Sequence, residues 1–211
     1  MPTRLMIIVG SVRPGRIGLP IATWVRERAE ANGGFDIDFV DLAELNLPFM
    51  DEPHHPRLRR YTKPHTIAWS ERVAAADAFL FVTPEYNHSF SPALKNAYDF
   101  LNNEWWRKPI GYVSYGGVSG GTRGVVALDQ AVTPLMVKVG ANVEINFAGG
   151  RVVDGVFVPN DKESALIEKE LDELIELSEV LKPSRLASEP ISAGLGRDRF
   201  GVGERAGVAS A

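Results

Sequence analysis

Residues 82–100 read VTPEYNHSFSPALKNAYDF, and this stretch decides the fold. It begins at the end of a continuous apolar run, which is typical of a strand covered on both faces of a sheet. Pro84 stops the strand because proline cannot donate a hydrogen bond to a neighbouring strand. Ser91 and Pro92 then open a helix as its N-cap and first residue. The stretch therefore predicts a buried strand, a polar turn at residues 85–88 and a helix.

The same alternation of strand and helix runs along most of the chain. Strand-like apolar runs lie at residues 5–9, 35–40, 78–82, 110–113 and 143–147. Apolar residues with helical spacing lie at residues 17–28, 94–101, 125–139 and 165–181. Pro134 is expected to kink or restart the third of these helices. The pattern predicts a three-layer α/β/α fold whose doubly wound, five-stranded parallel sheet has the order 2-1-3-4-5, with ligands bound beyond the carboxyl ends of the strands.

Length and composition narrow the class of protein. A chain of 211 residues with 45% hydrophobic residues suits one globular domain with a full core. No apolar run approaches the roughly 20 residues of a membrane span, and residues 1–10 lack the apolar core of a signal peptide. The net charge of −4 predicts no basic face for nucleic acid. We therefore expect a cytoplasmic protein with neither nucleic acid nor a membrane as partner.

The absence of cysteine excludes several kinds of site at once. Disulfides, zinc–thiolate sites, cysteine-held iron–sulfur clusters and thiol nucleophiles are all ruled out. His54 and His55 are adjacent and lack an evident third ligand, so no metal site is predicted. Residues 1–182 are expected to form the domain, with a long irregular connection at residues 46–64, which contain four prolines. Residues 183–211 are rich in Gly, Ala, Ser and Arg, and we expect them to be loosely ordered or packed on a neighbouring subunit.

The segment after the first strand, GSVRPGRIG at residues 10–18, has the features of an anion site. It leads into a helix, whose first N–H groups are free and whose dipole favours negative charge. Ser11 offers a hydroxyl, and Arg13 and Arg16 offer charged donors to a phosphate. The alternative is a tight glycine-rich turn with two solvated arginines. The segment contains neither the GK[ST] sequence of a P-loop nor the G-x-G-x-x-G sequence of a dinucleotide-binding loop.

Two further loops are expected at the same edge of the sheet. In TPEYN, after the third strand, Tyr86 could pack on a planar ring and the Asn87 amide could bond to its polar edge; the alternative is a capped surface turn. The loop after the fourth strand, SYGGVSGGTRG at residues 114–124, has five glycines, which suit the close approach of a ligand to the backbone. Its alternative is a flexible linker. Together the three loops describe a site for a ligand with a phosphate at one end and a flat ring at the other.

In their order and positions, these three loops resemble those of the NADPH-dependent FMN reductase family. This family has a flavodoxin-like fold and includes FMN, quinone, azo and chromate reductases. The resemblance covers roughly residues 4–181. Its most specific part is Pro84-Glu85-Tyr86-Asn87 followed by LKNAYD at residues 94–99. Residues 91–93 (Ser-Pro-Ala) stand where the family commonly has Ser or Pro followed by Gly.

The resemblance implies a binding role for residues of all three loops. The FMN phosphate would be held by Ser11, Arg13, Arg16, Ile17 and Gly18. The ribityl chain and the isoalloxazine ring would be lined by Pro84, Glu85, Tyr86 and Asn87. The other side of the ring would be flanked by Ser114, Gly116 and Gly117. The first loop departs from family members that carry Ser or Asn at positions corresponding to residues 16–18.

The implied chemistry belongs to the cofactor, so no catalytic side chain is predicted. NADPH or NADH would dock over the flavin and pass a hydride to N5. A small acceptor such as a quinone, free flavin, azo compound or chromate would then take its place in a ping-pong reaction. Family members are usually homodimers or homotetramers. The alternatives are a flavodoxin-like electron carrier, which uses no nicotinamide, and a flavin-free binding protein on the same fold.

Overall fold

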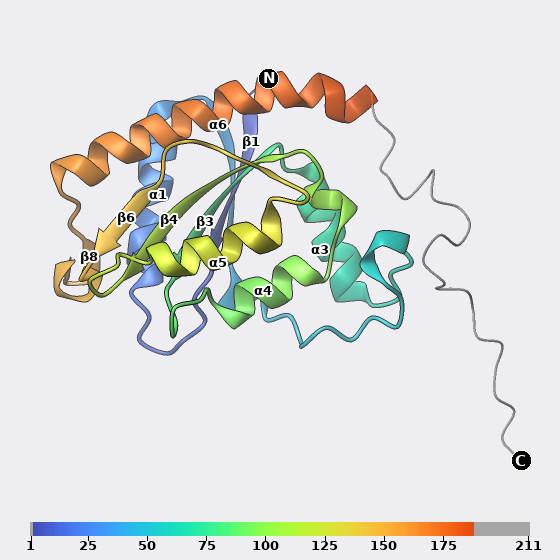
Figure 1. The fold of residues 1–211 in the computed structure, drawn as a ribbon, viewed down its shortest axis with the longest axis horizontal. Helices are drawn as coiled ribbons and strands as arrows, with labels where there is room; N and C mark the ends of the chain where they lie inside the picture. Colours follow the sequence, from blue (N-terminus) through green and yellow to red (C-terminus); the bar gives the residue numbers. More distant parts are fainter. Residues whose placement is uncertain (1, 188–211) are drawn as a thin grey trace, which may run out of the picture.

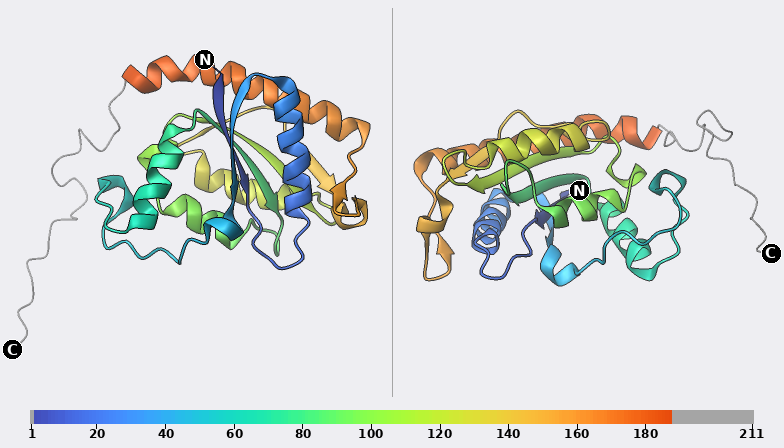
Figure 2. Two further views of the ribbon diagram at one scale, coloured as in Figure 1. Left: turned by 180° about the vertical axis from the view of Figure 1, so that it is seen from behind. Right: turned by 60° about the horizontal axis from the view of Figure 1, so that its bottom comes forward.

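In the computed structural model, which describes residues 2–187, a parallel sheet lies between two layers of helices (Figures 1 and 2). The sheet has the order β2-β1-β3-β4-β5, and β6 also pairs with β4. The strands are β1 (Thr3–Val9), β2 (Phe35–Asp41), β3 (Ala78–Pro84), β4 (Pro109–Gly116), β5 (Val137–Lys138) and β6 (Val143–Asn146). The predicted fold class and strand order are confirmed.

The helices are divided between the two faces of the sheet. One face is covered by α1 (Gly18–Asn32) and α6 (Asp161–Ala187). The other is covered by α3 (Pro64–Ala75), α4 (Pro92–Asp99) and α5 (Thr122–Val132). The smaller elements are α2 (Leu42–Leu45), three 3-10 turns (Pro56–Leu58, Asn103–Trp105 and Ala148–Arg151) and a hairpin of β7 (Val152–Val153) and β8 (Val156–Phe157). Each face of the sheet therefore has its own apolar cluster.

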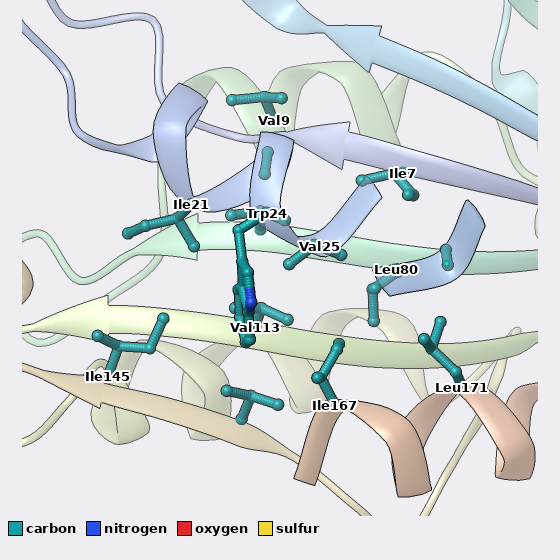
Figure 3. Close-up of a cluster of buried hydrophobic side chains, with 14 of the residues drawn as sticks. Ile7, Val9, Ile21, Trp24, Val25, Leu80, Val113, Ile145, Ile167 and Leu171 are labelled. Atoms are coloured by element: carbon teal, nitrogen blue, oxygen red, sulfur yellow. The ribbon is translucent and has the colours of Figure 1, made fainter. Parts of the chain in front are cut away.

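The central strands are apolar throughout because both of their faces are buried. Ile7 and Val9 of β1 lie beside α1, in the same apolar cluster as Val25 of that helix and Ile167 of α6 (Figure 3). The intervening Ile8 belongs to the cluster on the opposite face. All of these side chains are buried, and burying one aliphatic side chain contributes about 1.5–3 kcal/mol. The continuous apolar runs seen in the sequence are thus explained by their central position in the sheet.

The helix that follows β3 begins where the sequence predicts, but for one of the two reasons expected. Pro92 occupies the first turn of α4, where its missing N–H leaves no hydrogen bond unmade. Ser91 takes the N-cap position with an extended backbone, yet its side chain makes no capping hydrogen bond. The proline and the apolar face of the helix therefore account for this helix start.

The predicted helix at residues 125–139 is wrong in its second half. Helix α5 ends at Val132, with Thr133 as its C-cap, because Pro134 cannot continue it. The chain then returns to the sheet as β5, which pairs with the beginning of β4. The later strand β6 pairs with the end of β4. The fifth position of the sheet is thus shared by two short strands instead of the single predicted run at residues 143–147.

A buried carboxyl fills the gap between these two strands. The backbone N–H of Tyr112 lies opposite the gap and donates to Oε1 of Glu170, at 2.5 Å. Glu170 comes from α6 and is fully buried. Burial raises the pKa of its carboxyl well above the ordinary value, and the hydrogen bond from Tyr112 offsets only part of this rise. Glu170 thus completes the hydrogen bonding of β4 where the fifth strand is interrupted.

The long connection at residues 46–64 is held in place by acidic side chains. Glu52 accepts hydrogen bonds from the backbone N–H groups of Thr62 and Lys63. The buried carboxylate of Glu104 accepts a hydrogen bond from the hydroxyl of Tyr61. The segment is irregular in conformation, as predicted, but its backbone is anchored to the domain.

Helix α6 extends beyond the predicted domain limit at residue 182. Lys182 and Arg185 both pair with Asp77, which lies in the turn before β3. Residues 183–187, the beginning of the predicted tail, therefore belong to the helix. The rest of that tail, residues 188–211, lies outside the described residues.

Candidate functional site

The loops after β1, β3 and β4 meet at the carboxyl edge of the sheet, at the lower left of Figure 1. They enclose a cavity of about 280 Å³. Its lining consists of Ser11, Arg13, Gly15, Arg16, Ile17, Pro84, Glu85, Tyr86, Tyr115, Gly116 and Gly149. The structure therefore brings together residues from all three loops that the sequence singles out.

The first loop places polar groups at one end of this cavity. The hydroxyls of Ser11 and Tyr86 are hydrogen-bonded at 2.8 Å, which joins the first loop to the second. Arg13 is exposed and forms no ion pair with any of residues 2–187. The guanidinium of Arg16 pairs with Asp41 at the end of β2, but its Nε is buried and has no hydrogen-bond partner in the described chain. The first loop thus brings two cationic side chains to the cavity, and Arg13 has no anionic partner among residues 2–187.

Tyr115 provides a further donor that was not predicted from the sequence. Its hydroxyl is buried, and no group among residues 2–187 bonds to it with normal geometry. Burial raises the pKa of the Tyr115 phenol. The nearby side chain of Ser11 lowers this pKa by less than burial raises it, so the hydroxyl stays protonated. A Cβ on Gly18 would lie 2.3 Å from this hydroxyl, so Gly18 leaves the space that Tyr115 occupies. Buried donors without acceptors suit the oxygens of a phosphate.

The second loop is a tight turn whose tip points away from the cavity. Tyr86 and Ser89 exchange backbone hydrogen bonds of 2.8 and 3.0 Å. The two residues between them, Asn87 and His88, have φ values of 48° and 65°, as in a type I′ turn. Their side chains are exposed and do not line the cavity. Asn87 was predicted to line the ring site, but its position is explained by the left-handed conformation, which asparagine tolerates well.

Glu85 connects the second loop to the third. Its carboxylate accepts hydrogen bonds from the Ser119 hydroxyl (2.9 Å), from Arg123 Nε (2.7 Å) and from the backbone N–H groups of Arg123 and Gly124 (3.1 and 3.4 Å). Burial by itself raises the pKa of Glu85, but these hydrogen bonds outweigh it, so the net pKa lies below the ordinary value. The carboxylate also faces the first turn of α5, where N–H groups are otherwise unpaired. Glu85 therefore fixes the distance between the two loops.

The third loop contributes backbone to the cavity and uses its serine elsewhere. The Ser114 side chain is fully buried and donates to the carbonyl of Gly120, at 2.9 Å. Gly116 lines the cavity, whereas Gly117 is exposed and does not. Gly121 has a φ of 92°, and a Cβ there would lie 2.7 Å from that of Ser114. Ser114 thus shapes the loop from within and does not line the cavity.

Three lining residues were missed from the sequence: Gly15, Tyr115 and Gly149. Tyr115 carried a usable signal, because side chains alternate along a strand and Tyr115 faces the same side of the sheet as α1 and the first loop. Gly149 follows β6 and lies in no motif.

Two general properties of the described chain bear on its function. No helix within residues 2–187 has the length and apolar character to cross a membrane. In the same range, no group of three or more metal-ligating side chains could hold a metal ion.

Comparisons with known proteins identify the family of the chain. The family model for NADPH-dependent FMN reductases matches residues 3–150. An NAD(P)H-dependent FMN reductase of Nectria sp. is 34% identical over 196 residues, which cover 85% of this chain and 97% of that protein. One from Schizosaccharomyces pombe is 46% identical over 120 residues, which cover 56% of this chain and only 60% of that protein.

A solved structure shows the same fold. FerB, a flavoenzyme NAD(P)H:(acceptor) oxidoreductase of Paracoccus denitrificans, superposes with a TM-score of 0.68 at 21% identity, covering 85% of this chain and 98% of that chain. The strand order, the family match along most of the chain and the relative matched over nearly its whole length lead to one assignment. The chain belongs to the NADPH-dependent FMN reductase family.

Proposed function

We propose that this chain, an NAD(P)H-dependent oxidoreductase by its family, binds FMN in the cavity at the carboxyl edge and reduces a small organic acceptor. The observation that carries the proposal is the polarity of the cavity. Arg13 and Arg16 of the first loop line the cavity together with Tyr115, and Pro84 and Gly116 add backbone from the other two loops. The first group would form a phosphate end, and the backbone of Pro84 and Gly116 would form a ring end.

The residues of the first loop would bind and orient the phosphate. Arg13 would supply a charged donor from the open side, while Arg16 would turn its free Nε toward the anion and keep its bond to Asp41. The protonated hydroxyl of Tyr115 would donate from the buried side. Ser11, already bonded to Tyr86, would hold the turn of the second loop against the phosphate site.

The bound FMN would supply the redox chemistry by taking a hydride from NAD(P)H and passing two electrons to the acceptor. The carboxylate of Glu85, which lines the cavity, is not placed to act as an acid or a base. Glu85 is engaged by Arg123 and Ser119, and its lowered pKa keeps it ionised. Its role would be to keep the loops after β3 and β4 at a fixed distance, so that the flat ring fits between them. We propose one binding place beside the ring, which nicotinamide and acceptor would use in turn.

Spectroscopy of the FMN-loaded protein tests this function. We expect NADPH or NADH to bleach the visible absorbance of bound FMN under anaerobic conditions, and a quinone to restore it. If neither nucleotide bleaches it while dithionite does, the chain is an electron carrier and the reductase proposal fails. If no FMN binds at all, the site itself is wrong.

Location and assembly stay predictions from the sequence. The cytoplasmic location is tested by fractionating cells that express the chain. The expected homodimer or homotetramer is tested by sedimentation of the purified protein.

A further inference from the structure

Phe147 stands out among the residues at the carboxyl edge of the sheet. It follows the last residue of β6 and has φ 49° and ψ 39°, in the left-handed region. Bulky side chains rarely adopt this conformation, because the Cβ then crowds the backbone. Its side chain is also 66% exposed, so burial of the ring does not explain the conformation. Strained residues of this kind gather at functional sites.

The backbone around Phe147 is fixed to the loop that borders the cavity. Its N–H donates to the carbonyl of Gly117 (3.3 Å), and the preceding Asn146 donates through its side chain to the carbonyl of Val118 (2.6 Å). Val118 is 74% exposed. Two residues after Phe147, Gly149 lines the cavity. Phe147 and Val118 are therefore two exposed apolar residues held beside the ring end of the site.

The basic side chains nearest this pair in sequence already have carboxylate partners, whereas the exposed carboxylate of Glu144 pairs with no cation in residues 2–187. Arg151 is bonded to Glu163 in a two-pronged pair, and Arg123 is bonded to Glu85. The pair of Phe147 and Val118 is thus an apolar surface whose nearest basic side chains are already engaged and offer an anion no free cation. Such a surface favours a flat, uncharged ring over a small oxyanion, because an oxyanion would lose hydration without gaining a donor.

We propose that Phe147 and Val118 form an apolar platform that receives the ring of an uncharged quinone beside the flavin and so determine acceptor specificity. The inference rests on the proposed function. It assigns the two residues to the acceptor and leaves flavin binding to the residues that line the cavity. The reaction it serves is balanced as quinone + NAD(P)H + H⁺ → hydroquinone + NAD(P)⁺.

The variant Phe147→Asn tests the platform without disturbing the fold. Asparagine accepts the left-handed conformation, so the backbone is kept while the apolar ring is removed. We expect the KM for an uncharged naphthoquinone to rise about tenfold, in the range seen when an apolar contact is lost. The Kd for FMN and the KM for ferricyanide, an anionic acceptor with no apolar ring, should stay within about twofold. Phe147→Tyr keeps an aromatic ring, so its KM for the quinone should equal that of the parent.

Val118→Asn is the second test, and Val180→Asn on α6 is its matched control. Both valines are exposed, by 74% and 67%, but Val180 lies near the far end of the long helix. Only Val118→Asn should raise the quinone KM.

An unchanged quinone KM in both Phe147→Asn and Val118→Asn overturns the platform, while ferricyanide reduction still upholds the reductase. Loss of ferricyanide reduction in the FMN-loaded parent overturns the proposed function itself. An altered sedimentation coefficient in Phe147→Asn with an unchanged quinone KM assigns Phe147 to contact with a second copy, and also overturns the platform.

Discussion

The carboxylate of Glu85 bonds to both the side chain and the backbone of Arg123, at 2.7 Å from Nε and 3.1 Å from the backbone N–H. Glu85 belongs to the loop after β3, and Arg123 to the first turn of α5. One side chain thus sets the spacing of two of the three loops that enclose the cavity. A site for a flat ring needs walls at a fixed distance from each other, and this pair holds two of the loops at such a distance.

Replacing Glu85 with Gln should weaken the contact between the loop after β3 and the start of α5. The amide keeps the size of the carboxyl but loses the charge that draws in the guanidinium of Arg123 and the N–H groups of α5. We expect FMN affinity to fall about tenfold, or roughly 1.4 kcal/mol. Fluorescence titration with FMN measures this change. An unaltered Kd would show that the two loops keep their spacing without the pair.

The lowered pKa of Glu85 also predicts a pH dependence. A carboxyl whose pKa is lower in the folded state stabilises that state above its unfolded pKa, near 4.5, and the contribution is lost as pH falls through the folded value. Acid should therefore destabilise the parent more steeply than Glu85→Gln below about pH 4.5. Urea unfolding over a range of acidic pH compares the two slopes. Equal slopes would contradict the shifted pKa.

Arg13 and Arg16 should differ in their effects on stability. Arg16 pairs with Asp41, whose side chain is only 2% exposed, so Arg16→Ala leaves a buried carboxylate unpaired. We expect a loss of about 3 kcal/mol in the free energy of unfolding. Arg13→Ala removes an exposed side chain and should cost less than about 0.5 kcal/mol. Urea unfolding without FMN separates the two, and equal losses would contradict the structural role given to Arg16.

A side chain at position 18 should clash with Tyr115. A Cβ at Gly18 would lie 2.3 Å from the Tyr115 hydroxyl, so Gly18→Ala must push one of the two aside. We expect a loss of about 1–3 kcal/mol in stability. Adding Tyr115→Phe removes the hydroxyl and should recover part of this loss, although the ring carbon at 3.2 Å stays close. A double-mutant cycle with no coupling between the two positions would refute the contact.

Glu170 gives a pH dependence of the opposite sign. Its pKa is raised by burial, so the protonated form is favoured in the folded state and stability is lost as pH rises above the unfolded value of 4.5. Glu170→Gln keeps an acceptor for the N–H of Tyr112 without a charge to bury. We expect this variant to be more stable than the parent, by a margin that grows as pH rises above 4.5. The exposed neighbour Glu179→Gln serves as control and should show no such margin.

Much of the fold could be predicted because its strands are central and covered on both faces. The run ending at Val82 is apolar at every position, and its short length and aromatic content favour a buried strand over a buried helix. The interrupted fifth strand was not predicted. Pro134 was expected to kink or restart the helix, but nothing in the sequence showed that a short strand follows it. The acceptor for Tyr112 comes from a glutamate 58 residues away. Long-range polar contacts leave no local pattern in a sequence.

The site was predictable to a similar degree. Loop positions followed from the strand order, and eight of the twelve implied residues line the cavity. Glu85 was implied to line the ring site; its carboxylate also holds the third loop. Ser114 was placed by motif alone, and its actual hydrogen bond to Gly120 depends on loop geometry. Phe147 was read as the last residue of a strand, because a positive φ at a phenylalanine has no signature in the sequence.

The central claim is that the arginine end of the cavity holds the phosphate of FMN. Titration of the flavin-free protein with FMN and with riboflavin, which lacks the phosphate, tests it in the parent, in Arg13→Ala and in the surface control Arg28→Ala. We expect the parent and the control to prefer FMN. Arg13→Ala should shrink that preference by about 10- to 150-fold, since a hydrogen bond to a charged group contributes roughly 1.5–3 kcal/mol. An unchanged preference for FMN in Arg13→Ala, or equal affinity for both flavins in the parent, would contradict the account.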